Sequence, residues 1–370
     1  MKTCLTRAIC LGACMSVAVP TFANEPAMAL GLPDVETTDI LAAVDDGVGN
    51  PLVSPLSVLL TMGLARAGLE PGQPPADMPP TVNLSYAVWY DTATRPSEAA
   101  ASNLTDVWQA DQETLSLAKD GIDRINAWAE EATKGLIPKL LSDPLDSATV
   151  VVISALHFKD NWSMPFPLAQ TAEKPFARPD GSTVDVRFMT SSKTFPSWKT
   201  DDGLVVAMGF QDGGYVLMRL PARDEEATET PAEISPQDES TEGETDRVPT
   251  PVLLAPEAAS FVRVAMPLLD LESSRDLNAV LEELGMDRAL AEGMQTIVDG
   301  GAVPGPLVQS VVFKADEAGV EAAAATAAIG VRSVEVNEAP LVQFDRPFEF
   351  FLMMPGIDTA LIAGVIRDPS

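Results

Sequence analysis

The chain has 370 residues, 46% of them hydrophobic, and a formal net charge of −30 at pH 7. Such an acidic surface repels phosphate backbones and anionic lipid heads, which argues against nucleic-acid binding. A single histidine and three cysteines leave few ligands for a zinc site, and no glycine-rich phosphate loop is present. We therefore expect no cofactor, no metal and no enzyme activity.

The first 23 residues have the composition of a secretory signal peptide. Lys2 and Arg7 precede an apolar stretch, and Ala23 is a small residue at the expected cleavage site. All three cysteines lie in this segment, so the protein cut after Ala23 contains none and is expected to be secreted or periplasmic. The alternative is a lipoprotein signal in which Cys14 is lipidated and anchors the protein to a membrane.

The next segments predict a buried helix, a loop and a strand. Ser54-Pro55-Leu56-Ser57 opens an apolar run to Ala67, which is typical of a serine-capped buried helix. The prolines in residues 70–80 predict a loop, and the apolar, aromatic segment from Leu84 to Tyr90 predicts a strand.

Strands and helices then follow one another without the regular alternation of a parallel α/β fold, which indicates an α+β protein. We expect an amphipathic helix from Gly121 to Leu141 and a buried strand from Val150 to Phe158. The strand contains His157, the only histidine, for which a structural role is commoner than a catalytic one. Further expected elements are strands over 184–189 and 214–220, a helix from Ser274 to Leu284 ended by Gly285, and a strand pair from Phe348 to Val365.

Residues 224–250 are rich in acidic side chains and contain no aromatic residue. A segment with so little apolar surface cannot order itself by burial, so we expect a disordered acidic insertion. Its acids lack the regular spacing of a calcium-binding loop, which favours a solvated tether over a cation site.

The segment from Gly319 to Gly330 combines small, uncharged residues with one charge. Four consecutive alanines would favour a helix by intrinsic propensity. Read as a strand, the segment places its small residues on one face and the lone charge, Glu321, on the other. A strand with such a face could slide between two existing strands without overpacking the core beneath them.

Several separate motifs, in matching order and spacing, resemble the serpin family of serine protease inhibitors. The motifs are Asn50 to Ser57, Ile125 to Ile137, Phe158 to Phe166, Glu317 to Thr326 and Asp345 to Phe348. The resemblance runs from about Pro33 to Ser370. It implies one domain over residues 24–370 with three β-sheets, about eight helices and an exposed reactive loop over residues 317–346.

The stretch between Gly68 and Leu84 is too short for the two helices that the family usually has there. We therefore expect a shortened helical region after the first buried helix. One of the missing helices carries the heparin site of activated members, so heparin activation is not expected in so acidic a protein. The protein is expected to be a monomer.

The resemblance also implies suicide inhibition. The target protease cleaves the loop, stays acylated, and is carried across the molecule as the hinge of the loop inserts into the main sheet. Position 320, usually Thr or Ser in inhibitory members, is Val here, and a β-branched residue should enter a sheet readily. By resemblance, the hinge consists of Glu317, Gly319, Val320, Glu321, Ala322, Ala323, Ala324, Ala325 and Thr326.

The scissile bond has two candidate positions. Counting from the hinge as in the family places the cut after Ser333, whereas a trypsin-like pocket would prefer to read Arg332 and cut the Arg332–Ser333 bond. We predict the second position and hence a trypsin-like target that forms a covalent complex. A cut after Ser333 or Val334 would favour an elastase-like protease, and a cysteine protease is a further alternative.

Beneath the main sheet, the family uses an Asn and His pair with two serines to hold its strands shut. The matching positions of this shutter are Ser154 and Gln309, beside Ser54 and Ser57. We expect Gln309 to donate a hydrogen bond to Ser154 or Ser54, because a buried amide must find partners. By the same resemblance, Trp162 lies at the breach, where the loop enters the sheet.

These observations lead to an inhibitor of a trypsin-like serine protease that acts outside the cytoplasm. The alternative is a non-inhibitory relative, a carrier or chaperone, whose loop is cut without trapping a protease. The small-residue hinge argues against this alternative.

Overall fold

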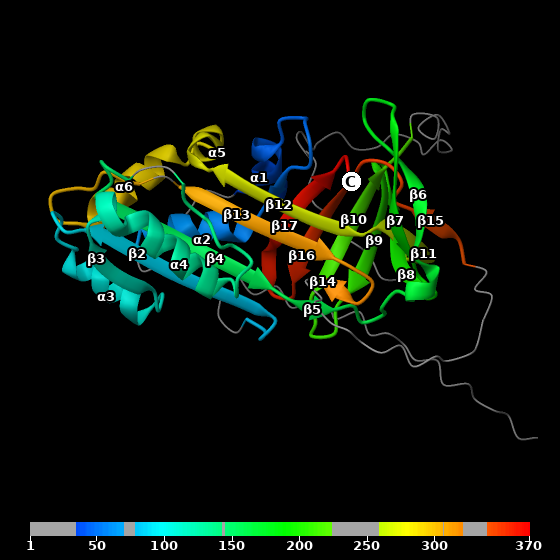
Figure 1. Ribbon diagram of the computed structural model, residues 1–370, viewed down its shortest axis with the longest axis horizontal. Coiled ribbons are helices and arrows are strands. Elements are labelled where there is room, and N and C mark those ends of the chain that lie inside the picture. The colour runs from blue at the N-terminus through cyan, green and yellow to red at the C-terminus, as the bar shows by residue number, and fades with distance from the viewer. Residues whose placement is uncertain (1–34, 70–77, 143–144, 224–258, 306, 321–338) are drawn as a thin grey trace, which may run out of the picture.

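The computed structural model describes residues 35–69, 78–142, 145–223, 259–305, 307–320 and 339–370 (Figure 1). Within these ranges it has three β-sheets, six α-helices, one π-helical turn and one 3-10 turn. The predicted α+β class with three sheets is confirmed. The predicted signal peptide, the predicted acidic insertion and most of the predicted reactive loop lie outside the described residues.

The largest sheet has ten strands, in the order β1-β17-β16-β10-β9-β8-β11-β7-β6, with β15 pairing in parallel with β11. Its predicted C-terminal strand pair is the hairpin β16–β17, which turns at Gly356 with a positive φ of 79°. The strands are β1 (Leu52–Val53), β6 (Ala172–Ala177), β7 (Thr183–Thr190), β8 (Phe195–Thr200), β9 (Gly203–Gly209), β10 (Tyr215–Pro221), β11 (Ser260–Pro267), β15 (Leu341–Gln343), β16 (Phe348–Met354) and β17 (Ile357–Ile366). A 3-10 turn, Leu168–Gln170, precedes β6.

Two smaller sheets lie edge to edge. One has the order β12-β13-β14-β5 and the other β3-β2-β4. Their strands are β12 (Leu269–Asp276), β13 (Val308–Ala315), β14 (Gly319–Val320), β5 (Asp160–Asn161), β3 (Asp111–Leu115), β2 (Val82–Asp91) and β4 (Val150–Phe158). At one end, Val150 forms a parallel bridge with Pro304. We call this combined surface the main sheet, and the gap between β4 and β13 the slot.

Helices cover both faces of the main sheet. On the inner face, α2 (Pro55–Ala65) packs against β4 and β17, and Ser54 caps it by accepting a hydrogen bond from the Ser57 amide. On the outer face, α4 (Ile122–Ala132) buries Ile125 and Trp128, whose ring meets Trp89 edge-on at 5.3 Å. The other helices are α1 (Thr37–Val44), α3 (Glu98–Asp106), α5 (Asn278–Glu283) and α6 (Asp287–Ile297), and a π-helical turn, Leu117–Gly121, precedes α4.

Two predicted helices have different bounds. The helix predicted to reach Leu141 ends at Ala132, because Lys134 and Gly135 adopt positive φ values of 52° and 88°. The helix predicted from Ser274 begins only at Asn278. Ser274 lies in β12, where it pairs with Ser310 of β13, so pairing with a distant strand outweighs the local helical spacing.

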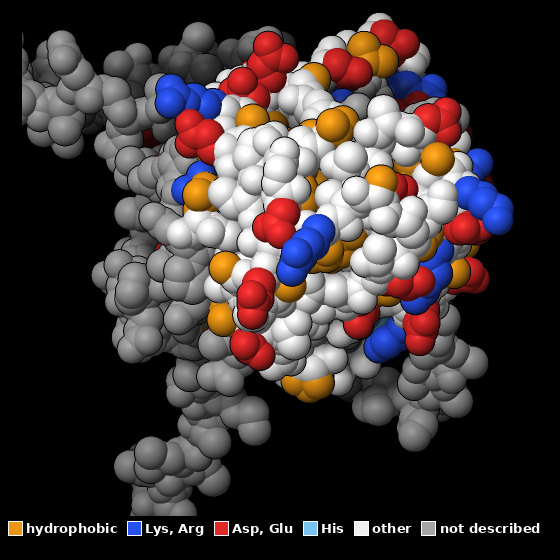
Figure 2. Space-filling model, turned by 90° about the vertical axis from the view of Figure 1, so that its left-hand side faces the viewer, with side chains coloured by type: hydrophobic (Ala, Val, Ile, Leu, Met, Phe, Trp, Pro, Cys, Tyr) orange, Lys and Arg blue, Asp and Glu red, His pale blue; other side chains and the backbone are white. Residues whose placement is uncertain are grey.

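On the end of the molecule shown in Figure 2, acidic and basic side chains are interspersed and hydrophobic ones are scattered. In the part of the chain that the structure describes, no helix is long and apolar enough to cross a bilayer. The same residues contain no group of three or more His, Cys, Asp or Glu that could hold a metal ion.

Candidate functional site: the slot in the main sheet

The slot is closed at one end and wedged open at the other. At the closed end, the Gly305 amide donates to the Val150 carbonyl at 2.8 Å, and the Thr149 amide donates to the Val303 carbonyl. At the open end, the two-residue strand β14 lies between β13 and β5. The cavity between these ends has about 20 Å³, room for roughly one water molecule, so a further strand requires β4 and β13 to separate.

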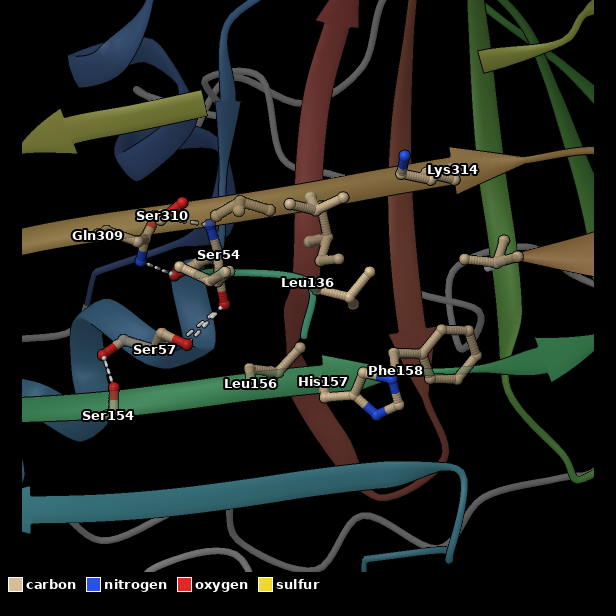
Figure 3. A pocket seen from close by; sticks show the side chains of 15 residues that line it. Ser54, Ser57, Leu136, Ser154, Leu156, His157, Phe158, Gln309, Ser310 and Lys314 are labelled. Carbon is tan, nitrogen blue, oxygen red and sulfur yellow. Dashed lines mark hydrogen bonds between the residues drawn. The ribbon is translucent and has the colours of Figure 1, made fainter. Parts of the chain in front are cut away.

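A buried polar cluster lies beneath the slot, at the start of α2 (Figure 3). Gln309 of β13 makes two hydrogen bonds of 2.9 Å to the backbone of Ser54: its Nε2 donates to the carbonyl, and its Oε1 accepts from the amide. The Ser54 hydroxyl donates to the Ser57 hydroxyl at 3.0 Å. One side chain of β13 is thereby attached to the N-terminus of the helix that supports β4.

Ser154 belongs to the other edge of the same cluster. Its hydroxyl donates to the Ser57 carbonyl at 3.0 Å and lies 2.9 Å from the hydroxyl of Thr61. Gln309 therefore bonds Ser54, through its backbone, and makes no hydrogen bond to Ser154 among those described. Sequence reasoning missed Thr61, although its position four residues after Ser57 places both on one face of α2.

At the open end, Trp162 binds the backbone of the segment with which the predicted reactive loop begins. Its indole Nε1 donates to the Asp316 carbonyl at 2.8 Å, and its backbone amide donates to the Ala318 carbonyl at 2.8 Å. The ring is buried and stacks on Phe210 with centroids 4.6 Å apart. Gly319 comes so close to the chain opposite that a Cβ would collide with the Asp160 carbonyl, which explains a glycine there.

Asp160 and Glu317 are two buried carboxylates at this entrance. Burial raises the pKa of Asp160, although the amides of Asn161 and Asp212 donate to its carboxylate. Glu317 accepts a hydrogen bond of 2.7 Å from the Thr171 hydroxyl and lies 3.6 Å from the Arg187 guanidinium. Sequence reasoning found Glu317 but neither of these partners, which lie far from it in the sequence: Thr171 just before β6 and Arg187 in β7.

The connector that follows α4, described over residues 133–142, covers the outer side of the slot. Leu136 and Ile137 line the slot together with His157 of β4. Asn126 ties the connector to α4, because its Oδ1 accepts from the amides of Leu140 and Leu141 at 2.8 Å. His157 is buried in β4, among groups that line the slot and not at an open surface.

Replacing Glu317 with lysine is expected to destabilise the native protein. The ammonium group would be buried beside Arg187, and the hydrogen bond from Thr171 would be lost, at a cost of about 2–4 kcal/mol. Thermal unfolding measures the effect. Glu317→Gln is the matched control, because it keeps an acceptor for Thr171 and loses only the attraction to an exposed arginine; equal effects of the two variants would contradict this assignment.

The structure brings together the predicted residues Ser54, Ser57, Ser154 and Gln309 at the slot, and Glu317, Gly319, Val320 and Trp162 at its entrance. The other predicted hinge residues and the predicted scissile bond lie outside the described residues. They comprise Glu321, Ala322, Ala323, Ala324, Ala325, Thr326, Arg332, Ser333 and Val334.

A comparison with protein families finds that residues 76–369 match the model described as "Serpin (serine protease inhibitor)". The chain belongs to the serpin family. One relative of this serpin is the leukocyte elastase inhibitor of Bos taurus, 30% identical over 264 residues, which cover 69% of this chain and 68% of the relative.

Solved serpin structures share the fold. Serpin48 of the insect Tenebrio molitor aligns with a TM-score of 0.71 and 22% identity, covering 90% of this serpin and 96% of the insect chain. Thyroxine-binding globulin in complex with thyroxine aligns with a TM-score of 0.68 and 16% identity, over 90% of this chain and 96% of that one. Both similarities concern the fold alone: one of these proteins is described as a highly specific serpin, and the other is in complex with thyroxine.

Proposed function

We propose that this serpin inhibits a trypsin-like serine protease by inserting its cleaved reactive loop into the slot between β4 and β13. The observation that carries the proposal is the register of β14. Val320 lies opposite Asp160 on one side and Ala315 on the other, antiparallel to both neighbours. Each further loop residue in this register would therefore move one residue back along β4 and along β13.

The inward face of the inserted strand would be small. Val320 is buried in the core beneath the main sheet, so the alternate residues after it, Ala322, Ala324 and Thr326, would face that core too. Alanine adds little volume between residues that are already packed, such as Leu156 and Val311 opposite Ala324. The fit explains why the segment contains alanine in place of larger apolar residues.

The one polar residue of this inward face would meet the one polar cluster beneath the slot. If the β14 register continues, Thr326 would come opposite Ser154 on β4 and Gln309 on β13. Both carry hydrogen-bonding groups at that level, Ser154 beside Thr61 and Gln309 beside Ser54. A threonine hydroxyl buried there would find partners, which a buried polar group requires.

The slot also has the length that the hinge requires. If the register continues, Gly330 would come opposite Val150 and Gly305, at the closed end of the slot. Insertion through Gly330 would replace that contact and bring Arg332 to this end of the sheet. A dozen new strand hydrogen bonds at about 0.5–1.5 kcal/mol each would contribute on the order of 10 kcal/mol.

Arg332 supports a trypsin-like target, and the signal-peptide-like composition of residues 1–23 supports action outside the cytoplasm. The test is incubation of the protein with trypsin at several ratios, followed by a denaturing gel and mass measurement of the released peptide. We expect a band that survives denaturation at the summed mass of both proteins, and a peptide that begins at Ser333. The cleaved protein is expected to unfold at a much higher temperature than the native one.

Cleavage without a stable complex or a gain in thermal stability would favour the carrier or chaperone alternative. A complex with an elastase-like enzyme and a released peptide that begins at Val334 or Glu335 would instead show that the cut follows Ser333 or Val334. A complex with a cysteine protease alone would change the target class.

Replacing Arg332 with alanine is expected to slow complex formation with trypsin by about a hundredfold or more, because the charge read by the trypsin pocket is removed. The association rate constant measures the effect. Arg95→Ala serves as control, since Arg95 is an exposed arginine whose side chain is 86% accessible. Unchanged inhibition by Arg332→Ala would contradict the predicted bond.

A further inference from the structure

We infer that Lys159 and Lys314 form a clamp that binds the Glu321 carboxylate at the first step of loop insertion. This inference rests on the proposed function. The two lysines belong to opposite edges of the slot, and both are described residues. Glu321 is the only charged residue between Gly319 and Gly330, and it directly follows Val320 of β14.

Both lysines belong to the outer face of the main sheet. On β4, the odd-numbered residues Val151, Ile153 and Ala155 pack toward α4, and exposed Lys159 continues that series just after the strand. On β13, Phe313 and Ala315 are buried in the inner core, which leaves Lys314 between them on the outer face.

Extension of the β14 register by one residue would place Glu321 between the two lysines. Val320 pairs with Asp160 and Ala315, so the next loop residue comes opposite Lys159 on one side and Lys314 on the other. Val320 faces inward, so Glu321 would face outward, on the side of both lysines. Side chains directly opposite each other on neighbouring strands have Cβ atoms about 4.5–5.5 Å apart, within reach of an ion pair.

The clamp has one competing partner in the native protein. Lys314 is paired with Asp270 of β12 at 3.0 Å, and the two side chains are 47% and 73% exposed. An exposed pair of this kind is weak and exchanges readily, so Lys314 is available to a second carboxylate. The chain has 54 acidic and only 24 basic residues. Two lysines on either side of the position expected for Glu321 are therefore an unusual arrangement in this protein.

The clamp would act on the outcome of each encounter with a protease. After cleavage, insertion competes with hydrolysis of the acyl bond, and the first residue to insert is the one that the two lysines attract. Removing the carboxylate should lower the rate of insertion about two- to tenfold, the size expected for two exposed ion pairs. The number of inhibitor molecules consumed per protease trapped should rise accordingly, and high salt should weaken the effect.

The test compares Glu321→Gln with Glu272→Gln, which removes an exposed carboxylate from β12 of the same sheet. Trypsin is the probe. The measurements are the stoichiometry of inhibition, the rate of insertion and the unfolding temperature of the cleaved form, each at low and high salt. We expect Glu321→Gln to slow insertion and lower the stability of the cleaved form, and Glu272→Gln to change neither.

A double-mutant cycle identifies the partners. Lys159→Gln and Lys314→Gln should each reduce insertion in the parent protein and have no further effect once Glu321 is glutamine. Asp270→Asn controls for the native partner of Lys314, since it breaks the same pair and keeps the lysine.

The outcomes separate the clamp from the function on which it rests. If the parent traps trypsin and gains stability, but Glu321→Gln behaves like Glu272→Gln or the cycle shows no coupling, the clamp is wrong and the proposed function stands. If the cleaved parent gains no stability and traps no protease, the proposed function fails and the clamp fails with it.

Discussion

Replacing Ala324 with glutamate is expected to convert the inhibitor into a substrate, so that trypsin cleaves the loop and is released without a stable complex. In the register set by β14, Ala324 would face the core between Leu156 and Val311. Burying an unpaired carboxylate there would cost several kcal/mol, a large part of the free energy that insertion releases. We expect the fraction of encounters that end in a trapped protease to fall at least tenfold.

The measurement is a denaturing gel with trypsin, together with thermal unfolding before and after cleavage. The native form of Ala324→Glu should unfold within about 2 °C of the parent, because the proposed function has this residue enter the sheet only after cleavage. Ala118→Glu is the control, since Ala118 is exposed in the π-helical turn. Full trapping by Ala324→Glu would mean that this residue does not face the core, and would contradict the register.

Replacing Gln309 with alanine is expected to have the second large effect. The Gln309 amide is the partner of both the amide and the carbonyl of Ser54, which is buried at the start of α2. Losing both bonds leaves the buried Ser54 amide unsatisfied, at about 1–3 kcal/mol, and the Ser54 carbonyl keeps only its bond from the Val58 amide. We expect the native protein to lose about 2–4 kcal/mol, which corresponds to a fall of several degrees in the unfolding temperature.

The same substitution should make β13 easier to separate from β4, because Gln309 attaches β13 to the helix beneath β4. We therefore expect faster spontaneous insertion of the uncleaved loop on gentle warming, measured as slow loss of inhibitory activity. Ser310→Ala is the control, since Ser310 neighbours Gln309 on β13 but belongs to the opposite face of the sheet. If Gln309→Ala changes neither the stability nor the rate of loop insertion, Gln309 does not hold β4 and β13 together.

Elements with purely local causes could be predicted well. The Ser54 cap and the proline after it define where α2 begins, and the apolar run from Val150 to Phe158 coincides with β4. The end of α4 was missed because Lys134, a residue that rarely adopts positive φ, does so beside Gly135.

The candidate site was predicted only in part. Resemblance to the family located Gln309, but the side-chain pattern could not show that it bonds the backbone of Ser54. Lys159 and Lys314 carried no signal as a pair, since 155 positions separate them in the chain. Arg187 and Thr171 were likewise invisible as partners of Glu317, because 130 and 146 positions separate them from it in the chain.

The sequence by itself determined the small, uncharged face of the hinge, the serine cap of α2 and the buried strand beside the slot, because each depends on residues close together in the chain. Only the tertiary structure decided which residues of β4 and β13 the hinge would meet. A shift of one residue would turn Glu321 toward the core and Thr326 away from Ser154 and Gln309. That register depends on how β14 packs between strands that are distant in sequence, with Trp162 and Gly319 holding it in place.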